Sequence, residues 1–126
     1  MTKHAAFAAP DDLVETQRAR LAAARKPDGH FLFELEADST IPSEYVLLHH
    51  FLGEVRPERE AAVARYLRDG QREDGAWPLY QDGTGNLSAT VKAYWALKLI
   101  GDDPEAPHMA RARSWIIGHG GAEKAN

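Results

Sequence analysis

The chain has 126 residues, of which 44% are hydrophobic, so it is long enough for one domain with a core and too short for two independent ones. Its formal net charge of -4 leaves no broad basic surface, which argues against nucleic acid as a partner. The absence of cysteine excludes disulfides and thiolate metal sites and fits a cytoplasmic protein.

The predicted elements begin after residues 1–10, which are expected to be flexible and carry no apolar run of the kind found in signal peptides. From Asp11 onward apolar residues recur at helical spacing, and strand-like alternation is absent. The predicted helices cover residues 11–26, 42–52, 57–70, 88–100 and 107–119. The longest apolar run, residues 93–100, is too short to span a membrane. The chain is therefore predicted to be all-α.

A spacing pattern recurs where three of these helices end. The copies are Leu21-x3-Arg25-x3-Gly29-x-Phe31, then Leu67-x3-Gln71-x3-Gly75-x-Trp77, and a weaker Trp115-x3-His119 followed by Gly120-Gly121. Arg25, Gln71 and His119 lie 46 and 48 residues apart, and residues 43–53 precede residues 91–101 by 48. Coincidence among alanine-rich helices that stop at glycine is the alternative, but the paired spacing favours a repeat.

The two helices of each repeat differ in their polarity. Helices 42–52 and 88–100 are apolar over most of their circumference and are expected to be covered, whereas 57–70 and 107–119 have one apolar stripe. Their charged faces contain Arg59, Glu60, Arg65, Arg68, Arg111 and Arg113. An inner ring of covered helices and an outer ring facing solvent form an α/α toroid. With about two and a half hairpins, the toroid is expected to be partial and to leave an apolar edge.

The segment from Gln71 to Trp77, Gln-Arg-Glu-Asp-Gly-Ala-Trp, resembles the Gln-Trp repeat of the squalene-hopene and oxidosqualene cyclase family. Residues 28–48 and 86–94 resemble bacterial squalene-hopene cyclases in order and spacing. The similarity covers nearly all of residues 11–126 but only the beginning of a family chain. It implies an N-terminal segment of an enzyme that converts squalene to hopene or hopanol without a redox cofactor.

The resemblance also implies a division of the chain and a set of partners. Residues 11–35 would pack on the catalytic domain of a complete cyclase, and residues 36–126 would begin its second toroid. The remainder of the cyclase chain would be the direct partner, and squalene would bind only to the complete enzyme. Family enzymes lie peripherally on the inner membrane and form homodimers, through segments that this sequence lacks.

The Gln-Trp motif has a physical explanation of its own. The Gln71 amide can bond to unpaired backbone groups at the helix end, the Trp77 indole can cover that amide, and Gly75 permits a tight turn at positive φ. Aromatic residues at regular helix ends usually pack, so the expected role is architectural. The resemblance agrees, because it implies that such motifs brace the toroid during a strongly exothermic cyclisation.

No catalytic residue is expected in this chain. The family's general acid is an aspartic acid in an Asp-x-Asp-Asp motif, which is absent; the pairs Asp11-Asp12 and Asp102-Asp103 stand beside prolines, where capping and turns explain them. The isolated chain is therefore expected to be inactive. None of the six histidines has ligand spacing, so no metal or other cofactor is expected.

Two residues are candidates for the substrate cavity. The resemblance implies that Glu44 belongs to a polar network there; from the residues alone, a first-turn glutamate exposed to water is the alternative. Leu35 matches a position near the cavity wall, with plain packing as the alternative. Lys92 stands where some relatives carry glutamate, so no role is transferred to it.

A second hypothesis is a small helical-repeat module that binds a protein partner through the apolar edge. Such modules normally end in a polar capping repeat. The last predicted helix instead keeps Trp115, Ile116 and Ile117 together, which suits an interrupted fold better than a finished cap.

Overall fold

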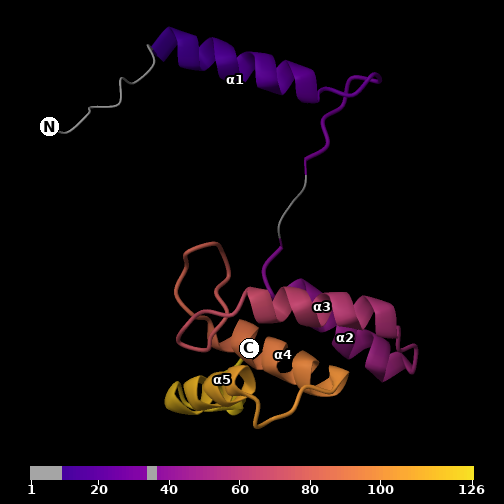
Figure 1. The fold of residues 1–126 in the computed structure, drawn as a ribbon, viewed down its shortest axis with the longest axis vertical. Helices are drawn as coiled ribbons and strands as arrows, with labels where there is room; N and C mark the ends of the chain where they lie inside the picture. The colour runs from indigo at the N-terminus through magenta and orange to yellow at the C-terminus, as the bar shows by residue number, and fades with distance from the viewer. Residues whose placement is uncertain (1–9, 34–36) are drawn as a thin grey trace, which may run out of the picture. The chain divides into compact units, whose positions relative to one another are not determined.

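The computed structural model describes residues 10–33 and 37–126. They form two units, one within the part up to Glu36 and one spanning Ala37–Asn126 (Figure 1). Leu35 and the stretch 1–9 that was expected to be flexible lie outside the described residues. Pro10, the last residue of that expected stretch, begins a helix.

The first unit contains the helix α1 (Pro10–Ala24), which ends two residues before the predicted end. None of its residues is buried, and the apolar side chains of Leu13, Val14 and Leu21 are more than half exposed. A turn follows α1 and is closed by an isolated antiparallel bridge between Arg25 and Phe31.

The second unit contains two helical hairpins and a short final turn. Its elements are α2 (Thr40–Leu52), α3 (Pro57–Asp69), α4 (Leu87–Ile100), α5 (Pro107–Gly118) and the 3-10 helix η1 (Ala122–Lys124). Across residues 10–33 and 37–126 there is no β-strand, only isolated bridges. The all-α prediction is confirmed, and none of the described helices is long and apolar enough to cross a membrane.

Local capping residues set the exact helix boundaries. α2 starts two residues before the predicted Pro42, and Asp38 Oδ1 accepts a bond at 2.7 Å from the backbone N–H of Thr40, the first residue of the helix. α4 starts at Leu87, where the Asn86 side chain accepts from Ala89 N. Both helices end at a left-handed glycine, Gly53 and Gly101, which are 48 residues apart. The repeat inferred from spacing is thus also a repeat of helix ends.

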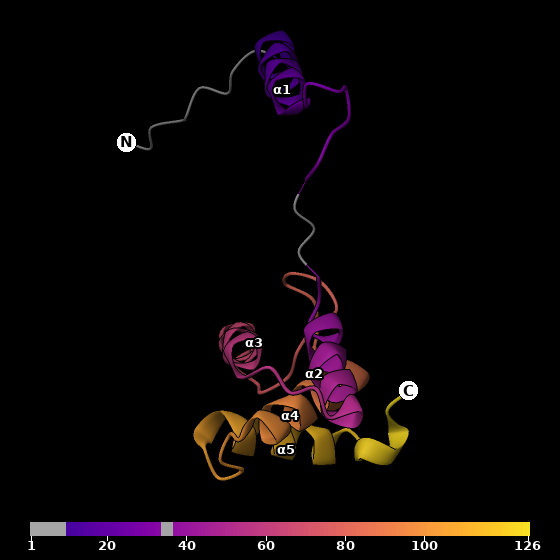
Figure 2. The same ribbon diagram turned by 90° about the vertical axis from the view of Figure 1, so that its right-hand side faces the viewer.

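The centre of the second unit is α4, which packs against α2, α3 and α5. Figures 1 and 2 show it between the α2–α3 pair and α5. Its buried surface is made largely of Ala89, Ala93 and Ala96, whose short side chains let the neighbouring helices approach closely. Among the larger core side chains, Leu97 belongs to α4 itself, and the others come from the segments around it: Val46, Leu67, Trp77 and Met109.

The two apolar helices, α2 and α4, are expected from their composition to be covered, but each is covered on one face only. Exposed apolar side chains remain on both of them: Ile41, Leu48, Phe51 and Leu52 on α2, and Trp95 and Leu99 on α4. None of the helices of the second unit packs over these side chains. Composition shows that a face is apolar, but it does not show which element covers that face.

Glu60 is a second correction. It was assigned to the charged face of its helix, yet it is only 6% exposed. Its Oε1 lies 3.0 Å from Nε2 of His50 on α2. The carboxylate is therefore turned toward the inner helix, where the His50 ring lies within ion-pair distance although the contact does not meet hydrogen-bond geometry.

Candidate functional site

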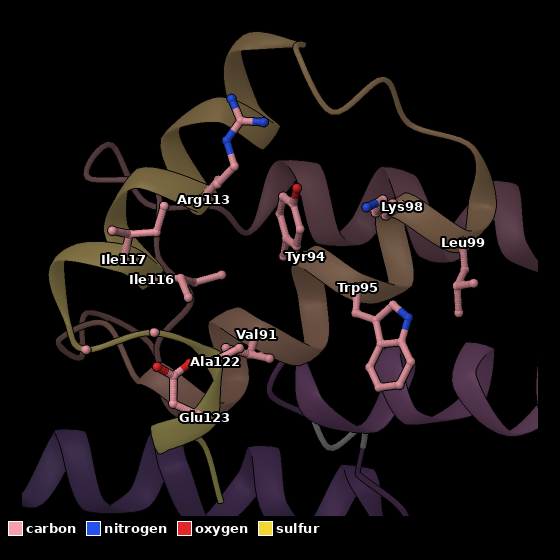
Figure 3. A pocket seen from close by; sticks show the side chains of 12 residues that line it. Val91, Tyr94, Trp95, Lys98, Leu99, Arg113, Ile116, Ile117, Ala122 and Glu123 are labelled. Carbon is pink, nitrogen blue, oxygen red and sulfur yellow. The ribbon is translucent and has the colours of Figure 1, made fainter.

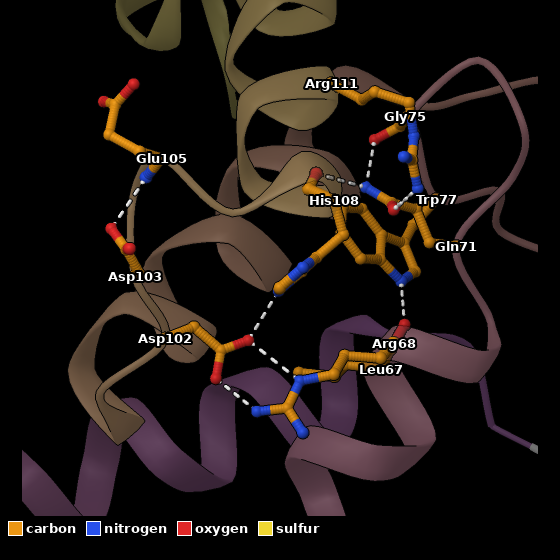
Figure 4. A network of polar contacts seen from close by, with 10 residues as sticks. All are labelled: Leu67, Arg68, Gln71, Gly75, Trp77, Asp102, Asp103, Glu105, His108 and Arg111. Atoms are coloured by element: carbon orange, nitrogen blue, oxygen red, sulfur yellow. Dashed lines mark hydrogen bonds and ion pairs between the residues drawn. The ribbon is translucent and has the colours of Figure 1, made fainter.

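The turn that follows α3 brings Gln71, Gly75 and Trp77 together, and Figure 4 shows them between the end of α3 and the start of α5. The turn closes through backbone bonds, with Gly75 N donating to Arg72 O at 2.9 Å and Arg72 N donating to Ala76 O at 3.0 Å. The turn thus places Gln71, Gly75 and Trp77 beside the end of α3 and the start of α5.

Gln71 links this turn to the next hairpin. Its side-chain Nε2 donates to Gly75 O at 3.0 Å and to His108 O, in the first turn of α5, at 2.9 Å. Its Oε1 accepts from the Arg111 guanidinium at 3.0 Å. One amide therefore holds the turn and attaches it to α5.

Trp77 is 1% exposed and bonds to the end of α3. Its indole Nε1 donates to Leu67 O, in the last turn of α3, at 2.8 Å. Its backbone N donates to the hydroxyl of Thr90 on α4 at 3.1 Å. The Gln71 amide bonds to the backbone of Gly75 and of His108, and the indole reaches the carbonyl left unpaired at the end of α3.

Gly75 has the positive φ, 94°, that the tight turn was expected to need. An added Cβ would lie 2.7 Å from the backbone C and O of Arg111 on α5. Both the conformation and the close approach of α5 therefore require glycine.

Asp102 provides a second attachment between α3 and α5, and sequence reasoning missed it. Its carboxylate, 6% exposed, accepts both hydrogen bonds of the Arg68 guanidinium and lies 2.6 Å from His108 Nε2 (Figure 4). Bonding to Arg68 holds the pKa of Asp102 below its ordinary value despite the opposing effect of burial, and His108 also lowers it. The same bond raises the pKa of Arg68.

The pair Asp102-Asp103 had been explained by capping and turn formation. That explanation fits Asp103, which accepts from Glu105 N at 2.9 Å. It does not fit Asp102, whose partners come from two other helices. The two adjacent aspartates look alike in the sequence. The only signal for the pairing is Arg68, an arginine on the charged face of α3.

The first copy of the motif, in the first unit, has the same backbone with fewer attachments. Gly29 has φ 94°, and Arg25 Nε donates to Gly29 O at 3.2 Å. Phe31, which occupies the position of Trp77, is 44% exposed. In the third copy, the rings of Trp115 and His119 stack with centroids 3.6 Å apart.

Glu44 lies in the first half of α2 and forms an ion pair with Lys92 on α4, with 2.7 Å between Nζ and Oε1. Both side chains are partly exposed, at 52% and 31%. These two residues are 48 positions apart, so the pair joins equivalent positions of neighbouring repeats. Leu35 lies outside the described residues. Within those residues, no three His, Asp or Glu side chains are grouped so as to hold a metal ion.

Residues 14–126 match the family described as the squalene-hopene cyclase N-terminal domain. The chain belongs to this family. The squalene-hopene cyclase of Zymomonas mobilis is 53% identical over 117 residues, which cover 92% of this chain and 18% of that protein. The squalene-hopene cyclase of Alicyclobacillus acidocaldarius is 39% identical over 105 residues, covering 83% of this chain and 17% of that protein.

A third relative, the squalene-hopene cyclase of Bradyrhizobium diazoefficiens, is 55% identical over 103 residues, covering 81% of this chain. The chain spans 16–18% of the length of these curated cyclases. It therefore corresponds to the N-terminal part of the squalene-hopene cyclase family, and its all-helical structure agrees with that family's fold.

Proposed function

We propose that the chain is a scaffold segment of a squalene-hopene cyclase, in which it starts a toroid that encloses the substrate. The observation that carries the proposal is the turn at Gln71 and Trp77, which bonds the end of α3 to the start of α5. The partners of Gln71 and Trp77 are backbone groups, the buried Thr90 hydroxyl and the Arg111 guanidinium, so the turn stabilises the arrangement of helices and takes no part in chemistry.

The chemistry would belong to the complete enzyme. By family membership, the complete enzyme would protonate squalene with an aspartic acid and cyclise it to hopene or hopanol without a redox cofactor. Peripheral association with the inner membrane and homodimerisation belong to the same proposal and rest on the family resemblance alone.

The first unit would pack on the catalytic domain, as expected for residues 11–35. Support comes from α1, which has no buried residue and leaves Leu13, Val14 and Leu21 exposed. An isolated helix of 15 residues is marginal in water, so such a helix gains stability only by packing its apolar side chains.

Glu44 would contribute to the polar lining of the substrate cavity. It lies on α2 among exposed apolar side chains, Ile41 and Leu48, and it is fixed by Lys92. A carboxylate held by an ammonium group on a largely apolar face fits a cavity wall with a few placed polar groups. The proposed cavity position of Leu35 rests on the resemblance only.

A segment exchange tests the proposal. The part of the Zymomonas mobilis cyclase that aligns with this chain is replaced by residues 10–126 of this chain, and conversion of squalene to hopene is measured. The chimera is expected to form hopene, whereas the isolated 126-residue chain is expected to form none. A folded but inactive chimera, or hopene formed by the isolated chain, would overturn the proposal.

A further inference from the structure

The structure describes the whole loop between Trp77 and α4, and none of its side chains belongs to the core or lines the apolar groove that Figure 3 shows between α4 and α5. An isolated bridge between Pro78 and Gly85 and a bond from Asn86 N to Trp77 O at 2.9 Å close the loop at its base. A chemical change in the middle of the loop is therefore separated from the helices on either side.

Asp82 lies in the middle of this loop. Its φ is 60°, and among residues 10–33 and 37–126 no other residue except glycine has a positive φ. Residues with a Cβ rarely adopt this left-handed conformation, because the Cβ approaches the following carbonyl oxygen. Asp82 is exposed, and within the described part of the chain its carboxyl group has no hydrogen-bond or ion-pair partner. The group is therefore free to turn toward the backbone of Gly83.

An aspartate that precedes a glycine can rearrange to isoaspartate. The glycine backbone N attacks Cγ of the protonated side chain, the new N–C bond forms, and water leaves to give a cyclic succinimide. Water then adds to the original main-chain carbonyl and breaks its bond to N, so that the chain runs through the side-chain carbonyl and the main-chain carboxyl becomes free. The overall mass is unchanged and only water is needed. Glycine favours the attack because it has no Cβ to obstruct it.

The second unit contains two other Asp-Gly pairs, and the first of these to compare is Asp74-Gly75. The Asp74 carboxylate accepts from Ala76 N at 3.1 Å and from the Arg72 guanidinium at 3.3 Å. Gly75 N donates to Arg72 O at 2.9 Å, and the residue lies against the backbone of Arg111 on α5. Attack by Gly75 N would therefore require breaking the turn that attaches α3 to α5.

The other pair is Asp69-Gly70, at the end of α3. Gly70 N donates to Tyr66 O at 3.0 Å and so continues the hydrogen bonds of the helix. Releasing this N–H would unwind the last turn of α3, whose Leu67 carbonyl accepts the bond from the Trp77 indole. This pair is thus held by helix structure, although its aspartate is exposed.

Gly83 is held only within its own loop. Its N donates to Tyr80 O at 3.0 Å, and an added Cβ would meet only Tyr80 atoms. The Gly83 carbonyl accepts from Arg72 at 2.7 Å, but it belongs to the next peptide group and can stay in place. Loop motion alone can therefore release the nucleophile, without opening the core.

We propose that Asp82-Gly83 is a site of spontaneous isomerisation to isoaspartate in the folded chain, ahead of the other Asp-Gly pairs of the second unit. The loop is closed at its base and lies outside the core, so the modified chain is expected to stay folded. The exposed isoaspartate would be a substrate for a repair methyltransferase that recognises L-isoaspartyl carboxyl groups. This chemistry is independent of the proposed scaffold function.

The test ages the 126-residue chain at neutral pH, well below its thermal midpoint, and locates isoaspartate by peptide mapping and by labelling with an L-isoaspartyl methyltransferase. Isoaspartate is expected to accumulate several times faster at position 82 than at 69 or 74, with the thermal midpoint unchanged. Asp82→Glu is the control variant and should remove the signal at this position, because the longer side chain closes the ring far more slowly.

The same chain aged in urea shows whether the fold causes the preference. In urea the rates at positions 69, 74 and 82 are expected to become similar, since each aspartate precedes a glycine. Equal or slower modification at position 82 in the folded chain would overturn the proposal. A preference that persists in urea would overturn it too, because the cause would then be local sequence and not the loop. A thermal midpoint that falls in step with modification would contradict the expectation that the modified chain stays folded.

Discussion

The turns after α1 and α3 have nearly the same backbone and very different surroundings. Gly29 and Gly75 share a φ of 94°, and each turn closes with the same bond, Lys26 N to His30 O at 2.9 Å and Arg72 N to Ala76 O at 3.0 Å. This equality shows that the turn itself is a local structure, formed by a short sequence wherever it occurs.

The side chains that hold the two turns differ in what they can reach. The Arg25 guanidinium donates to Gly29 O within its own turn, whereas the Gln71 amide both donates and accepts and so also bonds to α5. Phe31 cannot donate a hydrogen bond, but the Trp77 indole can. Whether a turn is attached to the core therefore depends on the two residues at the positions of Gln71 and Trp77. The turn itself can form without that attachment.

The largest expected effect comes from removing the buried indole. Trp77→Ala should destabilise the second unit by about 3–5 kcal/mol, because it leaves a cavity and an unbonded Leu67 carbonyl. Urea unfolding followed by fluorescence of Trp95 and Trp115 measures this, since all the tryptophans lie in the second unit.

Phe31→Ala is the matched control and should change the same transition by less than about 0.5 kcal/mol. Equal losses at both positions would show that the two turns are attached alike. Trp77→Phe keeps most of the packing and separates it from the hydrogen bond to Leu67, so its cost should fall between the two.

A smaller effect is expected at the glycines. Gly75→Ala should cost roughly 2–3 kcal/mol, because alanine is strained at this φ and its Cβ would overlap the backbone of Arg111. Gly29→Ala would meet only the flexible Arg25 side chain, at 3.0 Å, and should leave unfolding of the second unit unchanged. The same fluorescence transition measures both, and equal losses would contradict the difference in attachment.

Much of this fold could be predicted from the sequence because its signals are local. Helix periodicity, prolines at helix starts and glycines after helix ends lie within a few residues of the structure they determine. The 48-residue shift between α2 and α4 was visible for the same reason, since Gly53 and Gly101 mark equivalent ends.

The polar attachments could not be predicted because their partners are distant in sequence. Asp102 and Asp103 look alike in the sequence, but only Asp102 meets Arg68, 34 residues away. Glu60 appears as a surface charge until α2 brings His50 to 3.0 Å. In each case a helix-packing contact decides which polar side chain is buried, and periodicity describes only one helix at a time.

The smallest expected effect tests the ionised carboxylate of Asp102, which attaches α3 to α5 beside the turn after α3. Asp102→Asn should cost roughly 1–2 kcal/mol near neutral pH, because it weakens the bonds to Arg68 and His108. The pKa of Asp102 is lower in the folded state than its ordinary value of 3.8, so its contribution is fully present above about pH 4. That contribution is lost as pH falls through the folded pKa. Urea unfolding at a series of pH values should therefore show the stabilities of wild type and Asp102→Asn converging below about pH 4.

Asp103→Asn is the exposed control, because its side chain can still accept the Glu105 bond, and its stability should follow that of wild type. If the stability curves of wild type and Asp102→Asn stay parallel in acid, the loss comes from packing and not from charge.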